Sequence, residues 1–393
     1  MSSAYLIAAK RTPIGKFLGG LAGVSAPQLA AEAIRAAVLE ASLPPERIDE
    51  VILGNVVSAG VGQAPARQAA LLAGIPASVA AVTINKVCGS GLKAVMLAAQ
   101  AIRAADARIV VAGGMEIMSQ APHLLLGTRT GWKFGPQQVV DSLQLDGLSC
   151  ATEGVAMGCL ADRTATGQQV SRDDQDAFAV ESHRRAVEAR EAGKFVREII
   201  PLTVKAGKTE ARVEHDEGPR PGATLADLAR LRPAFGDEGT ATAGNASQLS
   251  DGAAAVVVVD EGTARESRSP LKAKIVAYTT SGLEPKDLFM APVSAIEQVL
   301  SKAQLSLSDI DLLELNEAFA SQSLACIRAL KLPLEKVNVR GGAIALGHPI
   351  GASGARILVT LLHALEDCGG RRGLAALCLG GGNAVAMIVE RTD

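Results

Sequence analysis

The run Gly347-His348-Pro349-Ile350-Gly351-Ala352-Ser353-Gly354 leads directly into a helical pattern at residues 352–365 that is rich in Ala and Leu. A related run lies far upstream, where Asn85-Lys86-Val87-Cys88-Gly89-Ser90-Gly91 leads into an Ala-rich helical pattern at residues 91–104. In both places a glycine-rich turn precedes a long helix. Together with the strand patterns around them, these turns predict an α/β fold made of two related halves.

Strand and helix patterns alternate toward both ends of the chain. We predict helices at residues 27–40, 64–73, 91–104, 292–303, 317–330 and 352–365. We predict strands at residues 5–9, 51–53, 109–112, 253–259, 273–279, 311–315, 374–378 and 385–389. This alternation is typical of parallel strands joined by crossover helices. It stops between residues 119 and 247, which predicts a lid or binding module on the α/β body.

The composition excludes several classes of protein. The 393 residues carry 39 basic and 41 acidic side chains, a formal net charge of −2, so no general field draws the chain to nucleic acid or anionic lipid. No stretch approaches the ~20 consecutive apolar residues of a membrane-spanning helix. The first residues also lack the pattern of a secretory signal. We therefore expect a cytoplasmic protein with neither nucleic-acid nor membrane partners.

The chain is rich in small residues, and its cysteines are spaced apart from one another. Aromatic residues make up 3% of the chain and glycine occurs 40 times, so packing must depend on close backbone approach. The six cysteines form no C-x-x-C pair, and no histidine stands at metal-ligand spacing. We expect reduced thiols and no metal site.

Cys88 is the candidate nucleophile. It precedes Gly89-Ser90-Gly91 and a helix, where free N–H groups and the helix dipole stabilise a thiolate. The alternative is a buried cysteine that acts only as a small apolar side chain. The two glycines favour the first interpretation because they let a substrate approach the backbone closely.

Three further residues are candidates for acid, base or oxyanion chemistry. His348 lies between Gly347 and Pro349 and is suited to accept a thiol proton, although it could instead fix the turn as a core histidine. Cys378 ends a strand and opens the Gly380-Gly381-Gly382 turn, whose amides could face an oxyanion. Asn316 could hold a water or a carbonyl oxygen, or could cap the next helix.

In their order and spacing these motifs resemble the thiolase family, and within it most closely the acetyl-CoA C-acetyltransferases. The resemblance runs end to end and includes residues 113–116, 231–235, 242–247, 316–319 and 341–354. It implies a five-layer αβαβα fold of two duplicated halves with an inserted loop domain. The implied limits are 1–118 and 249–270 for the N-terminal half, 119–248 for the loop domain, and 271–393 for the C-terminal half. It also implies a homodimer or homotetramer.

The resemblance assigns a role to each candidate. Cys88 would carry the acyl group as a thioester while His348 accepts its proton, and Cys378 would act as acid or base on the second substrate. One oxyanion hole would use His348 and a water held by Asn316, and the other the amides of Cys88 and Gly380. The implied reaction is condensation of two acetyl-CoA to acetoacetyl-CoA and CoA, or thiolysis of a 3-oxoacyl-CoA. CoA thioesters would be substrates, with no tightly bound cofactor.

The resemblance further implies a CoA site across the loop domain. Its residues would be Arg220, Ser247, Leu148, Met157, Phe235, Ala243, Ala318 and Phe319. Arg220 could equally be a solvated surface charge.

Two departures from the family pattern leave the acyl group open. Ala156 stands where short-chain thiolases typically carry a histidine, and Leu288-Phe289-Met290-Ala291-Pro292 replaces a Met-Gly-x-Gly-Pro segment. Both changes reshape the acyl pocket, so a longer or branched 3-oxoacyl-CoA remains an alternative. The motifs also leave open a decarboxylating ketosynthase, which would lack a second catalytic cysteine, and a thiolase-like protein that binds CoA or lipid without turnover.

Overall fold

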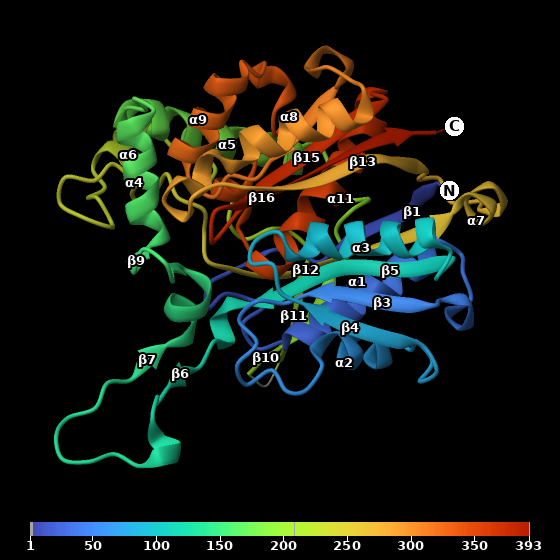
Figure 1. Ribbon diagram of the computed structural model, residues 1–393, viewed down its shortest axis with the longest axis horizontal. Helices are drawn as coiled ribbons and strands as arrows, with labels where there is room; N and C mark the ends of the chain where they lie inside the picture. The colour runs from blue at the N-terminus through green and yellow to red at the C-terminus, as the bar shows by residue number, and fades with distance from the viewer. Residues whose placement is uncertain (1–2, 208, 393) are drawn as a thin grey trace.

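The computed structural model describes residues 3–207 and 209–392 and arranges them in five alternating layers of helices and sheets (Figure 1). Each sheet belongs to one half of the chain, and a shared layer of helices lies between the two sheets. Further helices cover the outer face of each sheet. The layers confirm the predicted five-layer α/β fold.

The N-terminal sheet has the strand order β4-β3-β5-β12-β1, with the short β2 beside β12. These strands are β1 (Ala4–Arg11), β2 (Gly15–Lys16), β3 (Glu50–Gly54), β4 (Ala80–Ile84), β5 (Ile109–Ile117) and β12 (Ser250–Asp260). β12 lies between β1 and β5, although about 130 residues of sequence separate it from β5. The chain therefore returns to its first half after the loop segment.

The C-terminal sheet has the order β14-β15-β16-β13. Its strands are β13 (Ala273–Gly282), β14 (Leu312–Leu315), β15 (Arg372–Leu379) and β16 (Asn383–Arg391). A short pairing between β1 and β13, Tyr5 with Lys274 and Leu6 with Ala273, joins the two sheets at one edge.

The prediction of parallel strands is correct for only part of each sheet. β3 runs parallel to both β4 and β5, and β14 runs parallel to β15, but β12 and β16 are antiparallel to both of their neighbours. The reason is visible at β15 and β16, which only the short turn Gly380–Gly382 joins. Parallel neighbours need a crossover connection of a dozen residues or more, so a turn this tight makes an antiparallel pair.

Eleven α-helices lie within the described residues. They are α1 (Ala26–Glu40), α2 (Pro65–Leu72), α3 (Ser90–Ala104), α4 (Met157–Gly167), α5 (Arg172–Glu191), α6 (Leu225–Ala229), α7 (Glu261–Glu266), α8 (Ala291–Ala303), α9 (Ala320–Leu330), α10 (Ala343–Leu346) and α11 (Ile350–Cys368). α1 and α2 cover the outer face of the N-terminal sheet, α8 covers the C-terminal sheet, and α3 and α11 form the central layer.

Glycine allows α3 and α11 to pack backbone against backbone. A Cβ atom on Gly91 would lie 2.7 Å from the amide nitrogen of Ala355, and one on Gly354 would lie 2.4 Å from that of Leu92. No larger residue fits either position without separating the helices. Because these contacts lie in the first turn of α3 and the second turn of α11, the preceding turns with Cys88 and His348 come to lie together.

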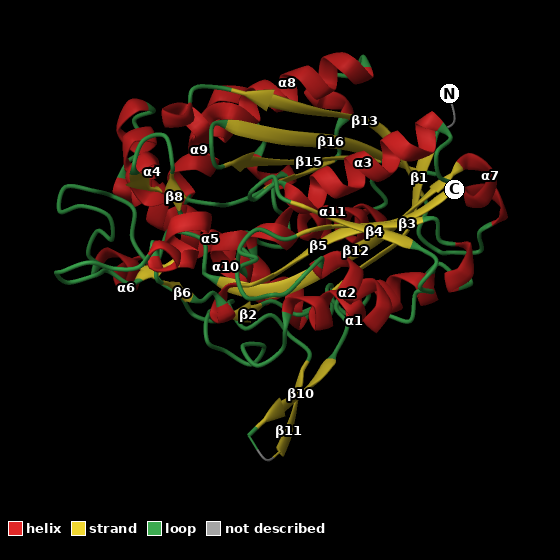
Figure 2. Cartoon of the chain, turned by 60° about the horizontal axis from the view of Figure 1, so that its bottom comes forward, coloured by secondary structure: helices red, strands yellow, loops and turns green. Residues whose placement is uncertain are grey.

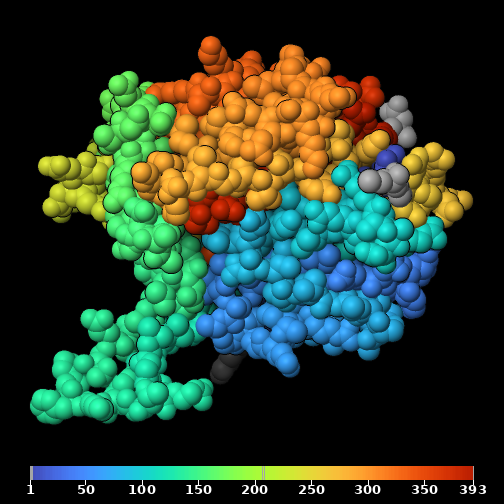
Figure 3. Space-filling model, in the orientation of Figure 1, coloured from blue at the N-terminus to red at the C-terminus, as the bar shows by residue number. Residues whose placement is uncertain are grey.

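The loop segment forms the remaining elements. They are β6 (His123–Leu124), β7 (Val140–Asp141), β8 (Ser149–Cys150), β9 (Val155–Ala156), β10 (Leu202–Ala206) and β11 (Thr209–Val213), together with α4, α5 and α6. Residues 121–141, here called the arm, stand away from the body (Figure 3). The β10–β11 hairpin also projects from it (Figure 2).

Most predicted elements are present, although one strand was missed and several boundaries differ by a few residues. The strand β4 was not predicted from the sequence. Its residues, Ala80-Ala-Val-Thr-Ile84, form an edge strand whose side chains are exposed or half-buried, and not a buried apolar run. The helix expected from residue 317 begins at Ala320, because Phe319 is still extended. No helix in residues 3–207 or 209–392 is long and apolar enough to cross a bilayer.

Candidate active site

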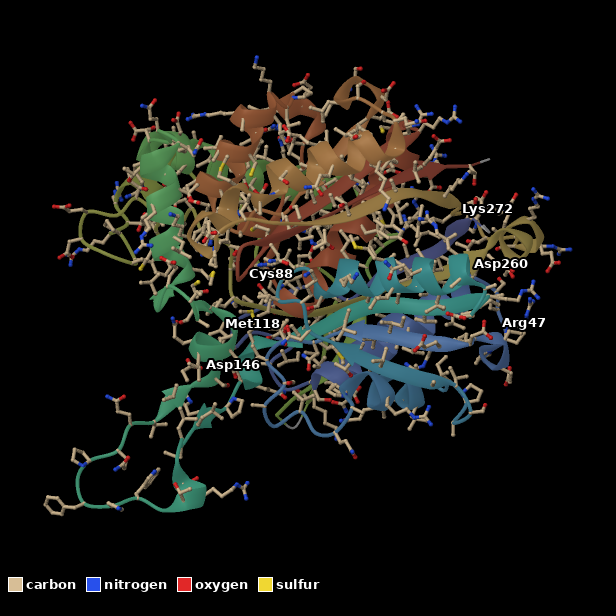
Figure 4. All side chains as sticks on the ribbon, viewed as in Figure 1. Arg47, Cys88, Met118, Asp146, Asp260 and Lys272 are labelled. Atoms are coloured by element: carbon tan, nitrogen blue, oxygen red, sulfur yellow. The ribbon has the colours of Figure 1, made fainter. Side chains whose placement is uncertain are left out.

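A cavity of about 130 Å³ opens where the two halves meet the loop segment, and four of the five predicted catalytic residues line it. Cys88 comes from the N-terminal half, and His348, Cys378 and Gly380 come from the C-terminal half. Figure 4 shows Cys88 at the start of α3, between the two sheets, with Met118 close by. The cavity is otherwise mostly apolar, as expected of a site for an uncharged acyl group.

The turn that carries Cys88 is strained and heavily hydrogen-bonded. Val87 has a φ of 45°, a left-handed conformation that β-branched residues rarely adopt. Its amide donates to Asn85 Oδ1 at 2.9 Å, and Ser90 Oγ donates to the carbonyl of Val87 at 2.6 Å. Lys86 N in turn donates to Ser90 Oγ at 2.8 Å. Strain held in this way is characteristic of residues that must aim a side chain.

The Cys88 turn packs directly on the Cys378 turn. A Cβ atom on Gly89 would lie 2.1 Å from Leu379 Cδ2, so only glycine permits this approach. The backbone amides of Gly380 and of Cys88 itself lie near the Cys88 sulfur and favour its thiolate form. Amides near a reacting thiol are suited to bind an oxyanion formed there.

The expected stabilisation of a Cys88 thiolate is not found in the free protein. Burial raises the pKa of Cys88 to about 12, and the nearby backbone amides of Gly380 and Cys88 offset only part of this effect. The loss of solvation in an apolar cavity outweighs the N–H groups at the start of α3. Cys88 is therefore a neutral thiol that needs a neighbouring base.

His348 is held as a neutral imidazole by its surroundings. Its backbone N–H donates to Gln248 O at 3.1 Å and to Ser250 Oγ at 3.2 Å, and its Nδ1 lies 2.6 Å from Ser353 Oγ. Burial, with a smaller effect of the Arg356 charge, lowers the pKa of His348 to about 3.

The hydrogen bonds of Ser353 decide which imidazole nitrogen is basic. Ser353 Oγ donates its single proton to Pro349 O at 2.9 Å, so Nδ1 of His348 is the nitrogen that carries hydrogen. Nε2 is buried and has no partner within the described chain. It carries the lone pair and is free to accept a proton from a group in the cavity.

Cys378 is a second buried thiol in the same site. It follows Leu377 near the end of β15 and belongs to an apolar cluster with Phe289 and Phe319. Burial raises the pKa of Cys378 well above its usual value, with smaller contributions from the nearby Cys88 and Cys326 thiols. A thiol of this kind is a strong base once deprotonated.

Asn316 is not among the lining residues, but it directly follows β14 and stands two residues before the lining residue Ala318. It is fully buried, and both its Oδ1 and Nδ2 lack a hydrogen-bond partner among residues 3–207 and 209–392. A buried amide without a protein partner is suited to hold water or a substrate oxygen. The alternative role as a helix cap is excluded, because Phe319 is the residue that precedes α9.

The predicted CoA-binding residues divide into two groups. Those that line the cavity are Ser247, Leu148, Met157, Phe235, Ala318 and Phe319. Ala243 is exposed and outside the lining. Arg220 is also exposed and outside it, and its backbone N–H donates to Nδ1 of the buried His183 at 3.2 Å.

Sequence reasoning missed part of the lining. These residues are Val87, Met118, Gln144, Gly147, Gly158, Ala246, Gln248, Leu249, Leu288 and Ile350. Most are neighbours of predicted residues, so adjacency along the chain is the signal that could have found them. Ala156 and Phe289, the two departures from the family pattern, both line the cavity.

Comparisons with known proteins agree with this geometry. The family model "Thiolase, N-terminal domain" matches residues 4–262, and "Thiolase, C-terminal domain" matches residues 269–391. The acetyl-CoA acetyltransferase of Cupriavidus necator is 50% identical over 392 residues, covering 100% of both chains.

Two solved structures have the same fold over the whole chain. The crystal structure of the Bacillus anthracis acetyl-CoA acetyltransferase has a TM-score of 0.97 at 41% identity, covering 100% of this chain and 99% of the other. The crystal structure of human mitochondrial 3-ketoacyl-CoA thiolase has a TM-score of 0.96 at 40% identity, with the same coverage. The chain therefore belongs to the thiolase family.

Proposed function

We propose that the protein transfers acyl groups between CoA thioesters through a thioester on Cys88. The observation that carries the proposal is the meeting of Cys88, His348, Cys378 and Gly380 around one apolar cavity. The reaction is the reversible condensation of two acetyl-CoA to acetoacetyl-CoA and free CoA. The names of the C. necator and B. anthracis relatives support acetyl as the transferred group.

In the first half-reaction Nε2 of His348 accepts the proton of the Cys88 thiol. The Cys88 sulfur forms a bond to the carbonyl carbon of acetyl-CoA, and the bond from that carbon to the CoA sulfur breaks. CoA leaves as its thiol with the proton that His348 returns. The neutral state of His348 supports this step, because an imidazole that is already protonated cannot accept the proton.

In the second half-reaction the deprotonated Cys378 removes a proton from the methyl group of a second acetyl-CoA. The resulting carbanion attacks the carbonyl carbon on Cys88, a C–C bond forms, and the bond from that carbon to the Cys88 sulfur breaks. The Cys88 thiolate then takes up the proton that Cys378 removed. In thiolysis the same steps run backward, and Cys378 protonates the departing enolate. Its raised pKa supports this role, since the acidity of a CH group next to a thioester is low and demands a strong base.

Two oxyanion sites fit the two stages. The amides of Cys88 and Gly380, which favour the thiolate form of Cys88, would stabilise the tetrahedral oxygen formed on that residue. A water held by Asn316 would donate to the enolate oxygen of the second substrate, and Nε2 of His348 would donate to it when that nitrogen carries a proton. The unpartnered amide of Asn316 supports this assignment.

CoA would enter over the loop segment. Ser247, Leu148, Met157, Phe235, Ala318 and Phe319 line the cavity and would contact the pantetheine arm. Ala243 and Arg220 lie outside the lining and would contact the outer part of CoA. The loop segment would act as a domain of residues 119–248, between a half of 1–118 with 249–270 and a half of 271–393. The position of β12 between β1 and β5 supports this division.

We also propose that the arm packs against a second copy of the chain in a homodimer or homotetramer. Its apolar side chains Leu125, Leu126, Trp132, Phe134 and Val139 are all exposed. The arm stands away from its own body, so it gains no burial there (Figure 3). A contiguous set of exposed apolar residues of this kind marks an interface.

Intact-protein mass spectrometry after mixing with acetyl-CoA tests the proposed reaction. The wild type should gain one acetyl group, Cys88→Ala should gain none, and Cys378→Ala should gain the group but neither form nor cleave acetoacetyl-CoA. Cys368→Ala, which changes an exposed thiol, is the matched control and should behave as the wild type. A wild type without an adduct, or an adduct that persists in Cys88→Ala, contradicts the proposal.

A further inference from the structure

Three phenylalanines form a continuous row along the cavity. The rings of Phe235 and Phe319 have centroids 6.0 Å apart, and those of Phe319 and Phe289 lie 5.4 Å apart, both pairs edge to face. Their exposed fractions fall from 36% at Phe235 through 9% at Phe319 to 2% at Phe289. The row therefore runs from an exposed lining residue, Phe235, to a fully buried one, Phe289.

Phe289 lies at the reacting end of the cavity. It belongs to the same buried apolar cluster as Cys378, while Phe235 at the other end packs on Gly158 at the start of α4. In the proposed reaction CoA would enter at the mouth, so the part of an acyl group that points away from CoA would extend toward Phe289. An added carbon on the acyl chain therefore meets this ring before it meets solvent.

The position of Phe289 is fixed by contacts on both its backbone and its ring. It lies in the short helix η5 (Pro285–Met290), and its carbonyl accepts a hydrogen bond from the buried thiol of Cys326 at 3.2 Å. The ring packs edge to face on Phe319. A side chain fixed in a dense core does not move aside at low cost, because protein interiors have few voids to receive it.

We propose that Phe289 closes the acyl end of the cavity and restricts the enzyme to acetoacetyl-CoA among 3-oxoacyl-CoAs of four or more acyl carbons. This proposal rests on the thiolase reaction proposed above and selects among its substrates. The departure from the family pattern at this position thus narrows the pocket rather than opening it to longer chains. One added methylene in an apolar pocket already changes kcat/KM by ~10–200-fold.

A chain-length profile tests the restriction. Thiolysis kcat/KM is measured for acetoacetyl-CoA, 3-oxohexanoyl-CoA and 3-oxooctanoyl-CoA with the wild type, Phe289→Ala and Phe289→Leu. For the wild type, kcat/KM should be at least about tenfold lower for 3-oxohexanoyl-CoA than for acetoacetyl-CoA. Phe289→Ala should raise the ratio of kcat/KM for 3-oxohexanoyl-CoA to kcat/KM for acetoacetyl-CoA by at least about tenfold, and Phe289→Leu should raise it by less.

Phe235→Ala is the matched control because it removes the same ring from the same row at the mouth. It should raise the KM of all three substrates by a similar factor and leave the ratios between their kcat/KM values unchanged. Phe289→Leu keeps most of the buried volume, so it remains informative if Phe289→Ala fails to fold. Either variant is compared only after thermal unfolding shows a folded protein.

The outcomes separate this proposal from the reaction on which it rests. A wild type that cleaves 3-oxooctanoyl-CoA as well as acetoacetyl-CoA overturns the restriction and leaves the thiolase reaction intact. Unchanged ratios in a folded Phe289→Leu and Phe289→Ala also overturn it. A wild type that forms no acyl adduct and cleaves none of the three substrates overturns the reaction itself.

Discussion

Gly114→Ala probes the contact that places His348. Gly114 lies on β5, and a Cβ atom there would stand 2.0 Å from the carbonyl oxygen of Gly351, in the first turn of α11. Real Cβ atoms essentially never come closer than 3.0 Å to such an atom. The start of α11 must therefore retreat by about 1 Å, because a backbone carbonyl cannot rotate away as a flexible side chain can.

The retreat has two calculable effects. Overpacking of a buried contact costs ~1–3 kcal/mol of unfolding free energy. The same shift moves His348, which stands two residues before α11, relative to Cys88 on the other half. A displacement of ~1 Å at a reacting group lowers the rate ~100-fold. The shift also strains the Gly351 N–H bond to Glu116 Oε2, now 2.8 Å, which ties β5 to α11.

The assay measures the single-turnover rate of Cys88 acylation by acetyl-CoA, together with urea unfolding of the same preparation. Gly114→Ala should acylate ~100-fold more slowly while still folded at the assay temperature. Gly23→Ala is the control, because a Cβ atom at Gly23 meets nothing within 4 Å. A folded Gly114→Ala protein that acylates at the wild-type rate would refute the view that this close contact positions His348.

Three further predictions follow from single contacts. Burial lowers the pKa of His348 to about 3. Below pH ~6.5 the unfolded chain therefore binds a proton at this imidazole, whereas the folded chain does not. The free energy of unfolding should fall by ~1.4 kcal/mol per pH unit from pH ~6.5 toward pH 4. His348→Asn should lack this part of the loss in urea unfolding at pH 6.5 and 4.5, and equal losses in both proteins would contradict the assignment. Ser353→Ala removes the partner of His348 Nδ1 and should lower kcat ~10-fold with little change in KM, whereas Ser353→Thr should restore it. The double variant Trp132→Ser, Phe134→Ser should lower the molar mass measured by light scattering without changing Tm. The control Leu39→Ser changes an exposed residue on α1 and should leave the molar mass unchanged. An unchanged molar mass for the arm variant would count against the proposed interface.

Much of the site was predictable because its residues lie on glycine turns that each precede or follow a regular element. Cys88 and His348 each precede a long helix, and Cys378 ends a strand, so their surroundings along the chain marked them. The electrostatics were not predictable in the same way. A helix N-terminus lowers the pKa of a thiol, but the burial that raises the pKa of Cys88 to about 12 comes from both halves and the loop segment.

The order of apolar runs and glycine turns along the chain was enough to predict the α/β class, the two halves, and the candidate thiols and imidazole. These features could be predicted because they follow from local periodicity and from the backbone freedom of glycine. Only the folded chain decided the strand directions, the hydrogen-bonded tautomer of His348 and the place of Phe289 at the closed end of the cavity. Each of these depends on contacts between segments far apart in sequence. Phe289, for example, meets Phe319 and Cys326 only because η5 packs against α9, and no pattern within residues 285–292 records that contact.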